Sequence, residues 1–260
     1  MVPFNSAIVG LGGRRVFILA KLDAEDLATL YVVDTQLEAQ FPSLVPALPG
    51  DLVQLTLGGF TFVAALADNF CIDAIGLDDE VEFELTLEAG CFIRGRGGEG
   101  GDGGNGEDGP SDPDDGEPGL IGGTAIRLGC PTNILGIGTI ERGYGGGGGG
   151  AGNDTGGEGD GGSGGGGGAP LGIGGREGRR DSGTPGDPGE TATVLLGGAG
   201  GTRHRNGGDG GSEGIPAEAG SGKTSPPPVG GAPGADGDAI DSQGFTVIQG
   251  PSIIVEGPII

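Results

Sequence analysis

The sequence predicts a mainly β N-terminal domain followed by a polyglycine-II helix bundle with irregular loops. Of the 67 glycines, 8 lie in residues 1–94 and 59 lie in residues 95–260. Nine of the eleven aromatic residues lie in the first part, so only that part can build a conventional apolar core. The second part carries a three-residue glycine repeat. We therefore place the boundary between the two domains after residue 94.

The clearest strand of the first domain is predicted at residues 81–88. Apolar and polar residues alternate there without a fault, and a period of two puts alternate side chains on one face of a strand. The residues of that face are Val81, Phe83, Leu85 and Leu87. The sequence therefore predicts a half-buried strand.

A hairpin is predicted just before that strand. The β-rich runs 52–57 and 60–63 flank Gly58-Gly59, and two adjacent glycines suit a tight two-residue turn. Further β-rich runs are residues 15–19, 30–33 and 91–93, and a short helix is expected at residues 24–30. We therefore expect a small, mainly antiparallel β-domain.

The glycine-rich part begins with a repeat of three residues. From Gly97 it reads Gly-Gly-Glu, Gly-Gly-Asp, Gly-Gly-Asn, and a helix of the polyproline-II type has that period and no internal hydrogen bonds. Because two of every three residues lack a Cβ, neighbouring helices can approach closely enough for hydrogen bonds between their main chains. The runs 145–150 and 164–168 present glycine on every face. We expect these two runs in the interior of the bundle.

The sequence leaves three other interpretations of the glycine-rich part open. A flexible linker is the usual fate of acidic, glycine-rich sequence, but a linker does not need the apolar stretches at 193–196, 245–248 and 253–255. A collagen helix needs glycine at every third position, and residues 176–188 break that register. A calcium-binding β-roll needs an aliphatic residue where Gly104 stands.

The net charge of −24 excludes several classes of partner. Both parts are acidic, and such a surface repels nucleic acid and anionic lipid. No window reaches the roughly 18 consecutive apolar residues of a membrane helix, so no membrane insertion is expected. The N-terminal residues also lack the basic start and long apolar stretch of a signal peptide, so no export through such a signal is expected.

The sequence favours neither an enzyme nor a cofactor-binding protein. Gly10 and Gly12 begin a dinucleotide-binding pattern, but Arg15 stands at its third glycine. Gly222-Lys223-Thr224 ends a relaxed phosphate-loop pattern, but Ser-Pro-Pro-Pro follows and prevents the helix that such a loop needs. A single histidine in a glycine-rich loop gives catalysis little support. No cofactor is expected.

The three cysteines, Cys71, Cys91 and Cys130, are expected to be buried free thiols. Their number is odd and they have no C-x-x-C spacing, so the sequence indicates neither a zinc site nor a disulfide framework. An unpaired cysteine behaves as a small hydrophobic residue. No metal site is expected.

The order of motifs resembles the glycine-rich tip adhesins of tailed bacteriophages. A β-rich leader ends at residues 87–98, GGx triplets follow, Gly138-Thr139-Ile140-Glu141-Arg142-Gly143-Tyr144 runs into a block of six glycines, and "GGGGGAPLG" begins at Gly164. The resemblance covers roughly residues 85–260. It implies a sandwich of polyglycine-II helices whose loops contact a host outer-membrane protein or surface glycan. It also implies a virion location at the distal tail, with residues 1–94 attached to other tail or fibre proteins.

Function is expected in the loops between the glycine runs, because loops on a rigid scaffold tolerate variation. The predicted loops are residues 110–118, 153–160, 176–188, 202–213 and 223–233. The candidate receptor-binding residues in or beside them are Asp112, Asp114, Asp115, Arg176, Arg179, Arg180, Arg203, His204, Arg205 and Lys223.

Two alternatives accompany these residues. Arginine forks suit the carboxylates and phosphates of surface polysaccharides, but the same arginines can pair with the many acidic residues of the chain. The three aspartates could hold Ca²⁺, but they lack the distant glutamate of an EF-hand, so solvated charge is the simpler interpretation.

Two further hypotheses compete with the adhesin. A structural glycine-rich spacer without a ligand would tolerate exchange of its loops. An ice-binding polyglycine protein would need a flat face without charge, and the 9 basic and 23 acidic residues after residue 94 argue against it.

Overall fold

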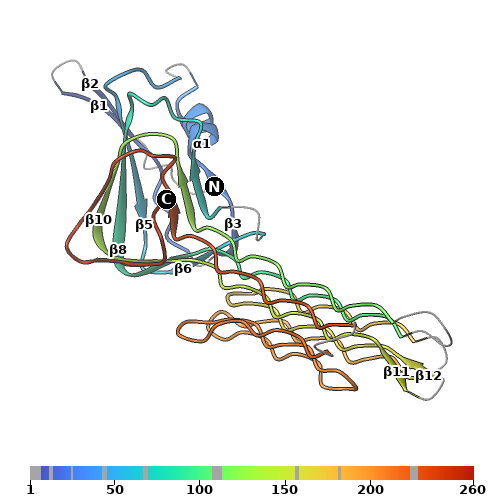
Figure 1. Cartoon of the computed structure of the whole chain (residues 1–260). Helices are drawn as coiled ribbons and strands as arrows, with labels where there is room; N and C mark the ends of the chain where they lie inside the picture. The colour runs from blue at the N-terminus through green and yellow to red at the C-terminus, as the bar shows by residue number, and fades with distance from the viewer. Residues whose placement is uncertain are drawn as a thin grey trace. The chain divides into compact units, whose positions relative to one another are not determined.

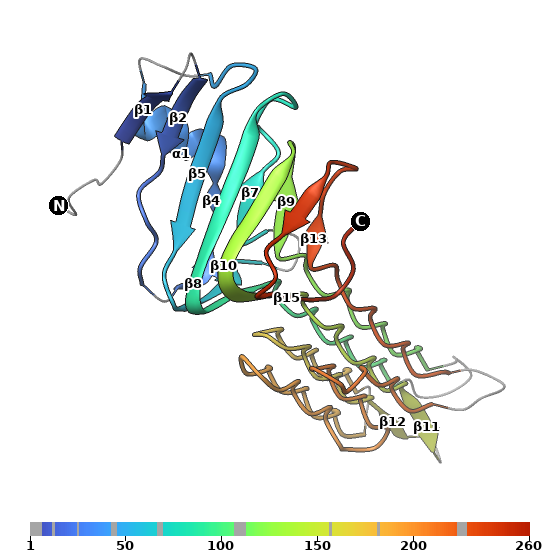
Figure 2. The same ribbon diagram turned by 90° about the vertical axis from the view of Figure 1, so that its left-hand side faces the viewer.

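The structure is a computed structural model, and it describes residues 7–11, 14–24, 26–42, 46–66, 70–106, 113–155, 158–180, 183–222 and 228–260. The chain divides into two compact units (Figures 1 and 2). Unit 1 comprises Met1–Arg94, Thr124–Glu141 and Asp238–Ile260, and unit 2 comprises Gly95–Gly123 and Arg142–Gly237. The segments 124–141 and 238–260, which were predicted to lie in the glycine-rich part, therefore belong to unit 1. They supply strands to its sheets.

Unit 1 is mainly β and contains two sheets. The nine strands of the larger sheet are β1 (Ala7–Leu11), β2 (Arg14–Ile18), β3 (Asp26–Thr29), β5 (Leu52–Leu57), β6 (Thr61–Ala64), β8 (Glu82–Arg94), β10 (Thr132–Glu141), β14 (Val247–Gln249) and β15 (Ile253–Glu256). The four strands of the smaller sheet are β4 (Tyr31–Val32), β7 (Ile72–Ala74), β9 (Ile126–Leu128) and β13 (Ile240–Asp241). Figure 2 shows β5, β8 and β10 side by side in one layer.

The expectation of a mainly antiparallel domain was wrong. Among the named strands of unit 1, β1 and β2 pair antiparallel, and every other pairing is parallel. From β4 to β14 the chain passes repeatedly from one sheet to the other and back. When it returns to a sheet, its new strand pairs in parallel with a strand that it formed there before. Alternation within a strand shows which face is buried, and it carries no information on the direction of the neighbouring strand.

The predicted hairpin at Gly58-Gly59 was also wrong. β5 and β6 do not pair with each other; β5 pairs with residues 82–87 of β8, and β6 pairs with residues 92–94. β8 bends between its two paired stretches, and so does the chain that joins β5 to β6. A Cβ built on Gly59 would overlap the carbonyl oxygen of Ala89, and Gly90 has a φ of +83°. The glycines thus allow two parallel strands to bend against each other.

The short helix lies later than predicted. It is α1 (Val33–Gln40), and residues 26–29 of the predicted helix form β3 instead. β4 occupies Tyr31–Val32, so the β-rich run predicted at 30–33 is shared between a short strand and the first residue of α1. Among the described residues, no helix has the length and the apolar character that crossing a membrane requires.

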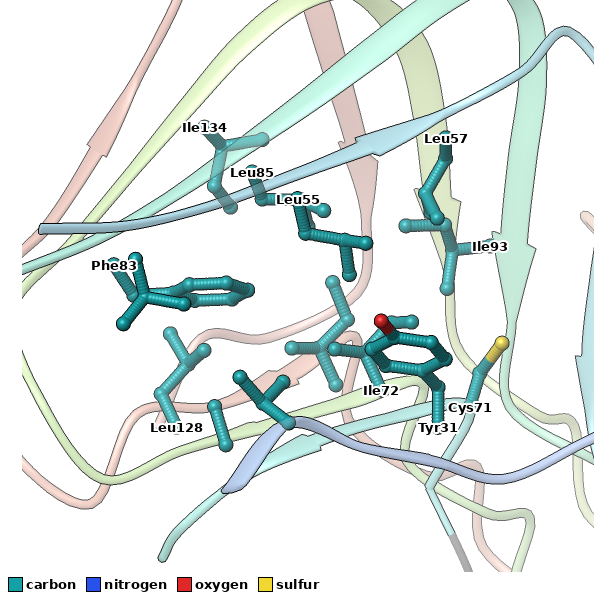
Figure 3. Packing of buried hydrophobic residues seen from close by; sticks show 14 of the residues in the cluster. Tyr31, Leu55, Leu57, Cys71, Ile72, Phe83, Leu85, Ile93, Leu128 and Ile134 are labelled. Atoms are coloured by element: carbon teal, nitrogen blue, oxygen red, sulfur yellow. The ribbon is translucent and has the colours of Figure 1, made fainter. Parts of the chain in front are cut away.

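Of the strand predicted at residues 81–88, residues 82–88 are confirmed as part of β8, and its apolar face lies in the core. Phe83, Leu85 and Leu87 are 1% exposed or less. Figure 3 shows residues of the larger sheet, among them Leu55 and Phe83, packed opposite Ile72 and Leu128 of the smaller sheet. Each such side chain contributes about 1.5–3 kcal/mol by its burial. The core of unit 1 therefore lies between its two sheets.

The three cysteines are free and buried, as predicted. Burial raises the pKa of Cys91 to about 12, with a further increase from the charge of Glu88, and burial likewise raises the pKa of Cys130 to about 12. We expect no alkylation of these two thiols by iodoacetamide at pH 8 in the folded protein, because the thiolate is the reactive form. Complete alkylation in urea, followed by mass spectrometry, is the control. Rapid labelling of the folded protein would contradict the prediction.

The same pKa values predict how stability responds to alkaline pH. Between the ordinary thiol pKa of 9.0 and about 12, the unfolded chain loses protons that the folded chain keeps. The free energy of unfolding should therefore fall as the pH rises through this window.

Unit 2 consists largely of extended segments that carry no regular helix or strand in the described residues. The exception is an antiparallel hairpin of β11 (Asn153–Thr155) and β12 (Glu158–Asp160). The other segments run side by side as undulating traces in Figure 1, and hydrogen bonds between their main chains join them.

These hydrogen bonds recur every three residues. The N–H groups of Gly97, Gly100, Gly103 and Gly106 donate to the carbonyls of Pro170, Ile173, Arg176 and Arg179, over 2.7–2.9 Å. The N–H groups of Gly98, Gly101 and Gly104 donate to another segment, at Tyr144, Gly147 and Gly150. Each triplet therefore bonds one neighbour with its first glycine and a different neighbour with its second.

The two glycine runs predicted to be interior are surrounded by other segments. Among the described residues, main-chain hydrogen bonds join residues 143–151 to six segments: 96–106, 114–123, 162–169, 205–211, 217–221 and 230–237. Residues 162–169 are likewise bonded to six: 98–104, 144–150, 172–178, 187–190, 198–201 and 205–211. All glycines of both runs are buried.

The bonding pattern arranges these segments in three layers. One outer layer contains 114–123, 97–106 and 172–179, in that order. The middle layer contains 230–237, 143–151, 162–169 and 187–190, and the other outer layer contains 217–221, 205–211 and 198–201. Side chains other than glycine can therefore project from the two outer layers and from the ends of the middle one.

Candidate functional site

The segments of unit 2 run between two ends of the unit, where the chain passes from one segment to the next. At one end, near β11 and β12, Gly104 bonds Gly150, and Ser163 bonds the carbonyl of Arg205. At the other end, Gly98 bonds Tyr144, and Ala169 bonds Gly211. We call the first the hairpin end of unit 2, and the second the opposite end.

Each of the five predicted loops has described residues at the hairpin end, whereas residues 114–118, 176–179, 207–211 and 230–233 of these loops belong to the bonded segments. The described residues beside each connection are bonded to one another across segments: Gly152 to Asp114, Gly106 to Arg179, Ser163 to Arg205 and Ala151 to Ser221. β11 and β12 form the remaining connection. Five stretches that are separate in the sequence therefore converge on one surface.

His204 lies at the centre of a polar cluster at the hairpin end. Its Nδ1 is 3.5 Å from Asp160 Oδ2, and its Nε2 is 2.5 Å from Thr184 Oγ1. The N–H of Thr184 donates to Asp160 Oδ1 over 2.8 Å. His204 has a φ of +60°, a backbone conformation that is uncommon outside glycine. The cluster ties together three connections. The sequence indicated no partner for His204, because residues 160, 184 and 204 are far apart in the chain.

The two arginines beside His204 are already engaged. Arg203 Nε lies 3.5 Å from Asp187 Oδ1, which bears out the alternative of pairing within the chain for this residue. Arg205 donates from its guanidinium to the carbonyl of Pro228 over 3.3 Å, and burial lowers its pKa. Both residues therefore join connections to each other.

Arg176, Arg179 and Arg180 behave differently. All three are exposed, and none forms an ion pair within the described parts of the chain. They line a shallow surface hollow together with Glu177, Gly178 and Pro185. One terminal nitrogen of Arg180 donates to the carbonyl of Gly183 over 2.9 Å. This hollow thus brings three of the candidate arginines together.

The described aspartates of the first predicted loop accept hydrogen bonds. Asp114 accepts from the side chain of Asn105 over 2.8 Å, and Asp115 accepts from the N–H of Val229 over 2.7 Å. Asp112 and Lys223, the other two candidates, lie outside the described residues. Within the described residues, no group of three or more histidine, cysteine, aspartate or glutamate side chains is placed to hold a metal ion.

Some polar side chains accept hydrogen bonds from the main chain of a neighbouring segment, a role that the sequence did not indicate. Asp102 and Asn105, the outward residues of two triplets, accept from the N–H groups of Arg176 and Arg179 over 2.7 and 2.9 Å. Asp209 accepts from the N–H of Gly200 in the same way. An outer segment has fewer neighbours to satisfy its N–H groups, and a buried or half-buried donor without a partner is costly. The triplet period indicated which residues point outward, but it did not indicate that they satisfy the neighbouring backbone.

Comparison with known proteins identifies the relatives of this chain. The family model of the phage tail fibre adhesin Gp38 matches residues 55–259. A search of curated proteins finds no match. The fold is similar to the crystal structure of the gp37–gp38 adhesin tip complex of the bacteriophage S16 long tail fiber, with a TM-score of 0.53 and 22% sequence identity, over 92% of this chain and 81% of that chain. The family match spans both units, so this chain belongs to the Gp38 family of phage tail fibre adhesins and is an adhesin of the distal tail of the virion.

Proposed function

We propose that unit 2 is a polyglycine-II bundle that holds a receptor-binding surface at its hairpin end. The three-residue recurrence of the hydrogen bonds supports the helix type, because a helix with this period must find its partners outside itself. Six bonded neighbours around each glycine run support the bundle. A scaffold held by main-chain bonds leaves the connections free to vary in sequence.

The receptor is a protein or polysaccharide on the surface of the bacterial host. The convergence of five connections at one end carries this proposal, since it brings the arginines, His204 and the aspartates of separate loops to one surface. The residues that we assign to the receptor-binding connections are those predicted from the sequence: Asp112, Asp114, Asp115, Arg176, Arg179, Arg180, Arg203, His204, Arg205 and Lys223. Arg203, His204 and Arg205 would act chiefly by holding neighbouring connections in place.

Unit 1 would join the chain to another tail fibre protein, through surfaces within residues 1–94. The similar solved structure is a complex of gp37 with gp38, which supports an association of this kind.

The receptor role is tested by exchanging connections at the two ends of unit 2. Replacing residues 202–206 by a glycine- and serine-containing sequence of equal length should lower adsorption of the phage to host cells about tenfold or more, since a loss of about 1.4 kcal/mol suffices for that change. The matched control is the same exchange at residues 193–197, which form a closed turn at the opposite end. Both variants are assembled into virions and checked by circular dichroism.

The outcomes separate the adhesin from a spacer. Reduced adsorption for the hairpin-end exchange alone supports the proposal. Unchanged adsorption for exchanges of residues 183–187 and 202–206 together would show that this end is a structural spacer without receptor contact.

A further inference from the structure

The hollow lined by Arg176, Arg179 and Arg180 lies on a corner segment of unit 2. Residues 172–179 form the end of one outer layer. Gly175 and Gly178 face inward and donate to the carbonyls of Gly165 and Gly162 over 2.7 and 2.8 Å. Arg176 and Arg179 are three residues apart and exposed, so they occupy the same face, about 9 Å apart along the segment at the rise of such a helix.

The backbone beneath the two arginines is fixed on both sides. Their carbonyls accept from Gly103 and Gly106 over 2.9 Å each. Their N–H groups donate to the side chains of Asp102 and Asn105. Asn105 is itself held by Asp114, over 2.8 Å. The main chain is therefore preorganised, while the guanidinium groups of Arg176 and Arg179 form no ion pair among the described residues.

The local charge is opposite to that of the whole chain. The described residues that line the hollow include three arginines and one acidic residue, Glu177, in a chain of net charge −24. Acidic side chains outnumber basic ones 37 to 13, and yet these arginines are not paired with them in the described structure. In the adjacent segment, the neutral Asn105 lies beside Arg179, and the carboxylate of Asp102 accepts from the main-chain N–H of Arg176. Among the described residues, arginines therefore outnumber acidic side chains in the lining of the hollow, and no carboxylate forms an ion pair with their guanidinium groups.

We propose that this hollow binds the carboxylate or phosphate groups of an anionic polysaccharide. The planar guanidinium offers paired donors that match both groups, and two of them on one straight edge can hold charges that recur along a polymer. A protein partner fits less well, because protein interfaces are anchored by aromatic side chains and the lining has none. The proposal rests on the receptor role of unit 2 and names the ligand chemistry of one part of its surface.

Purified full-length protein and defined oligosaccharides test the proposal. The probes are oligogalacturonate, which carries carboxylates, a phosphorylated mannan oligosaccharide, and a neutral maltooligosaccharide of similar length. Binding of an anionic probe by titration calorimetry should exceed that of the neutral one and weaken at high salt. The double variant Arg176→Gln/Arg179→Gln should raise its Kd about tenfold or more.

Two further variants make the result specific. Arg176→Lys/Arg179→Lys keeps the charge and loses the paired donors, so it should bind with an intermediate Kd. Arg14→Gln/Lys21→Gln changes the net charge by the same amount in unit 1 and should bind like the parent protein. Preference for one anionic probe identifies the group, carboxylate or phosphate, that the hollow recognises.

Three results would overturn the proposal. The first is equal binding of the neutral and anionic probes, and the second is an unchanged Kd in the double glutamine variant. The third is reduced adsorption to host cells by that variant without binding of either anionic probe, which would identify an acidic protein segment as the ligand. Any of these three results can occur while the exchange of residues 202–206 still lowers adsorption. In that case the receptor role of unit 2 stands, and only the proposal of a polysaccharide ligand is refuted.

Discussion

Gly147→Ala is expected to destabilise unit 2 by about 3 kcal/mol, the upper end of the usual cost of overpacking, because the site has no room for a methyl group. A Cβ built on Gly147 overlaps the carbonyl oxygen of Gly208. That carbonyl cannot withdraw freely, since it accepts from Gly166 over 2.9 Å, and the N–H of Gly208 donates to Gly148 over 2.8 Å. One methyl group therefore forces apart segments that are bonded on several sides. Hydrogen exchange of the amides in residues 143–150 measures the effect.

Gly214→Ala is the matched control for this substitution. Gly214 also lies in unit 2, but a Cβ built there has no other atom within 4 Å, and the φ of +71° is the source of its cost. That cost is about 1–2 kcal/mol, the penalty of a left-handed conformation for one residue. Equal effects of the two substitutions would mean that close approach of main chains does not hold unit 2 together.

Glu141→Gln is expected to destabilise unit 1 by about 3–5 kcal/mol, because it removes the charge of one member of a buried ion pair. Glu141 Oε2 lies 2.7 Å from Arg94 Nε, and the two side chains are 7% and 8% exposed. The two residues face each other in the parallel register of β10 and β8. Urea unfolding of the full chain, followed by circular dichroism, measures the loss.

The double variant Arg94→Met/Glu141→Leu separates charge from packing. Replacing both members of a buried pair by apolar side chains of similar volume is often neutral or stabilising. We expect this variant to regain most of the stability that Glu141→Gln loses. If the double variant is as unstable as the single one, the site depends on the shape of these side chains and the charge is secondary.

Much of the local structure could be predicted from the sequence. The alternation at residues 81–88 correctly identified Phe83, Leu85 and Leu87 as one buried face, since burial of one face imposes a period of two whatever the topology. The GGx triplets correctly indicated a three-residue spacing of contacts. The sequence did not predict the position of α1. It also did not predict the direction of the strands or the pairing at Gly58-Gly59, because β8 takes its partners from β5, β6 and β10 rather than from an adjacent hairpin.

The candidate site shows the same division. Arg176 and Arg179 could be proposed as ligand-binding residues from the sequence, because they lie in a predicted loop and arginine suits carboxylates and phosphates. Only the structure showed that they form no ion pair among the described residues. The cluster of His204, Asp160 and Thr184 could not, and neither could the support of the arginine backbone by Asp102 and Asn105. These contacts join segments 20 to 74 residues apart.

The sequence by itself determined which faces are apolar, where glycine removes the side chains, and hence which stretches can pack main chain against main chain. These properties follow from the chemistry of each residue and its immediate neighbours. The tertiary structure alone decided that the strands of unit 1 run parallel and that five connections of unit 2 meet at one end. Both depend on which distant segments become neighbours, and many pairings of similar strands or glycine runs satisfy the same local pattern.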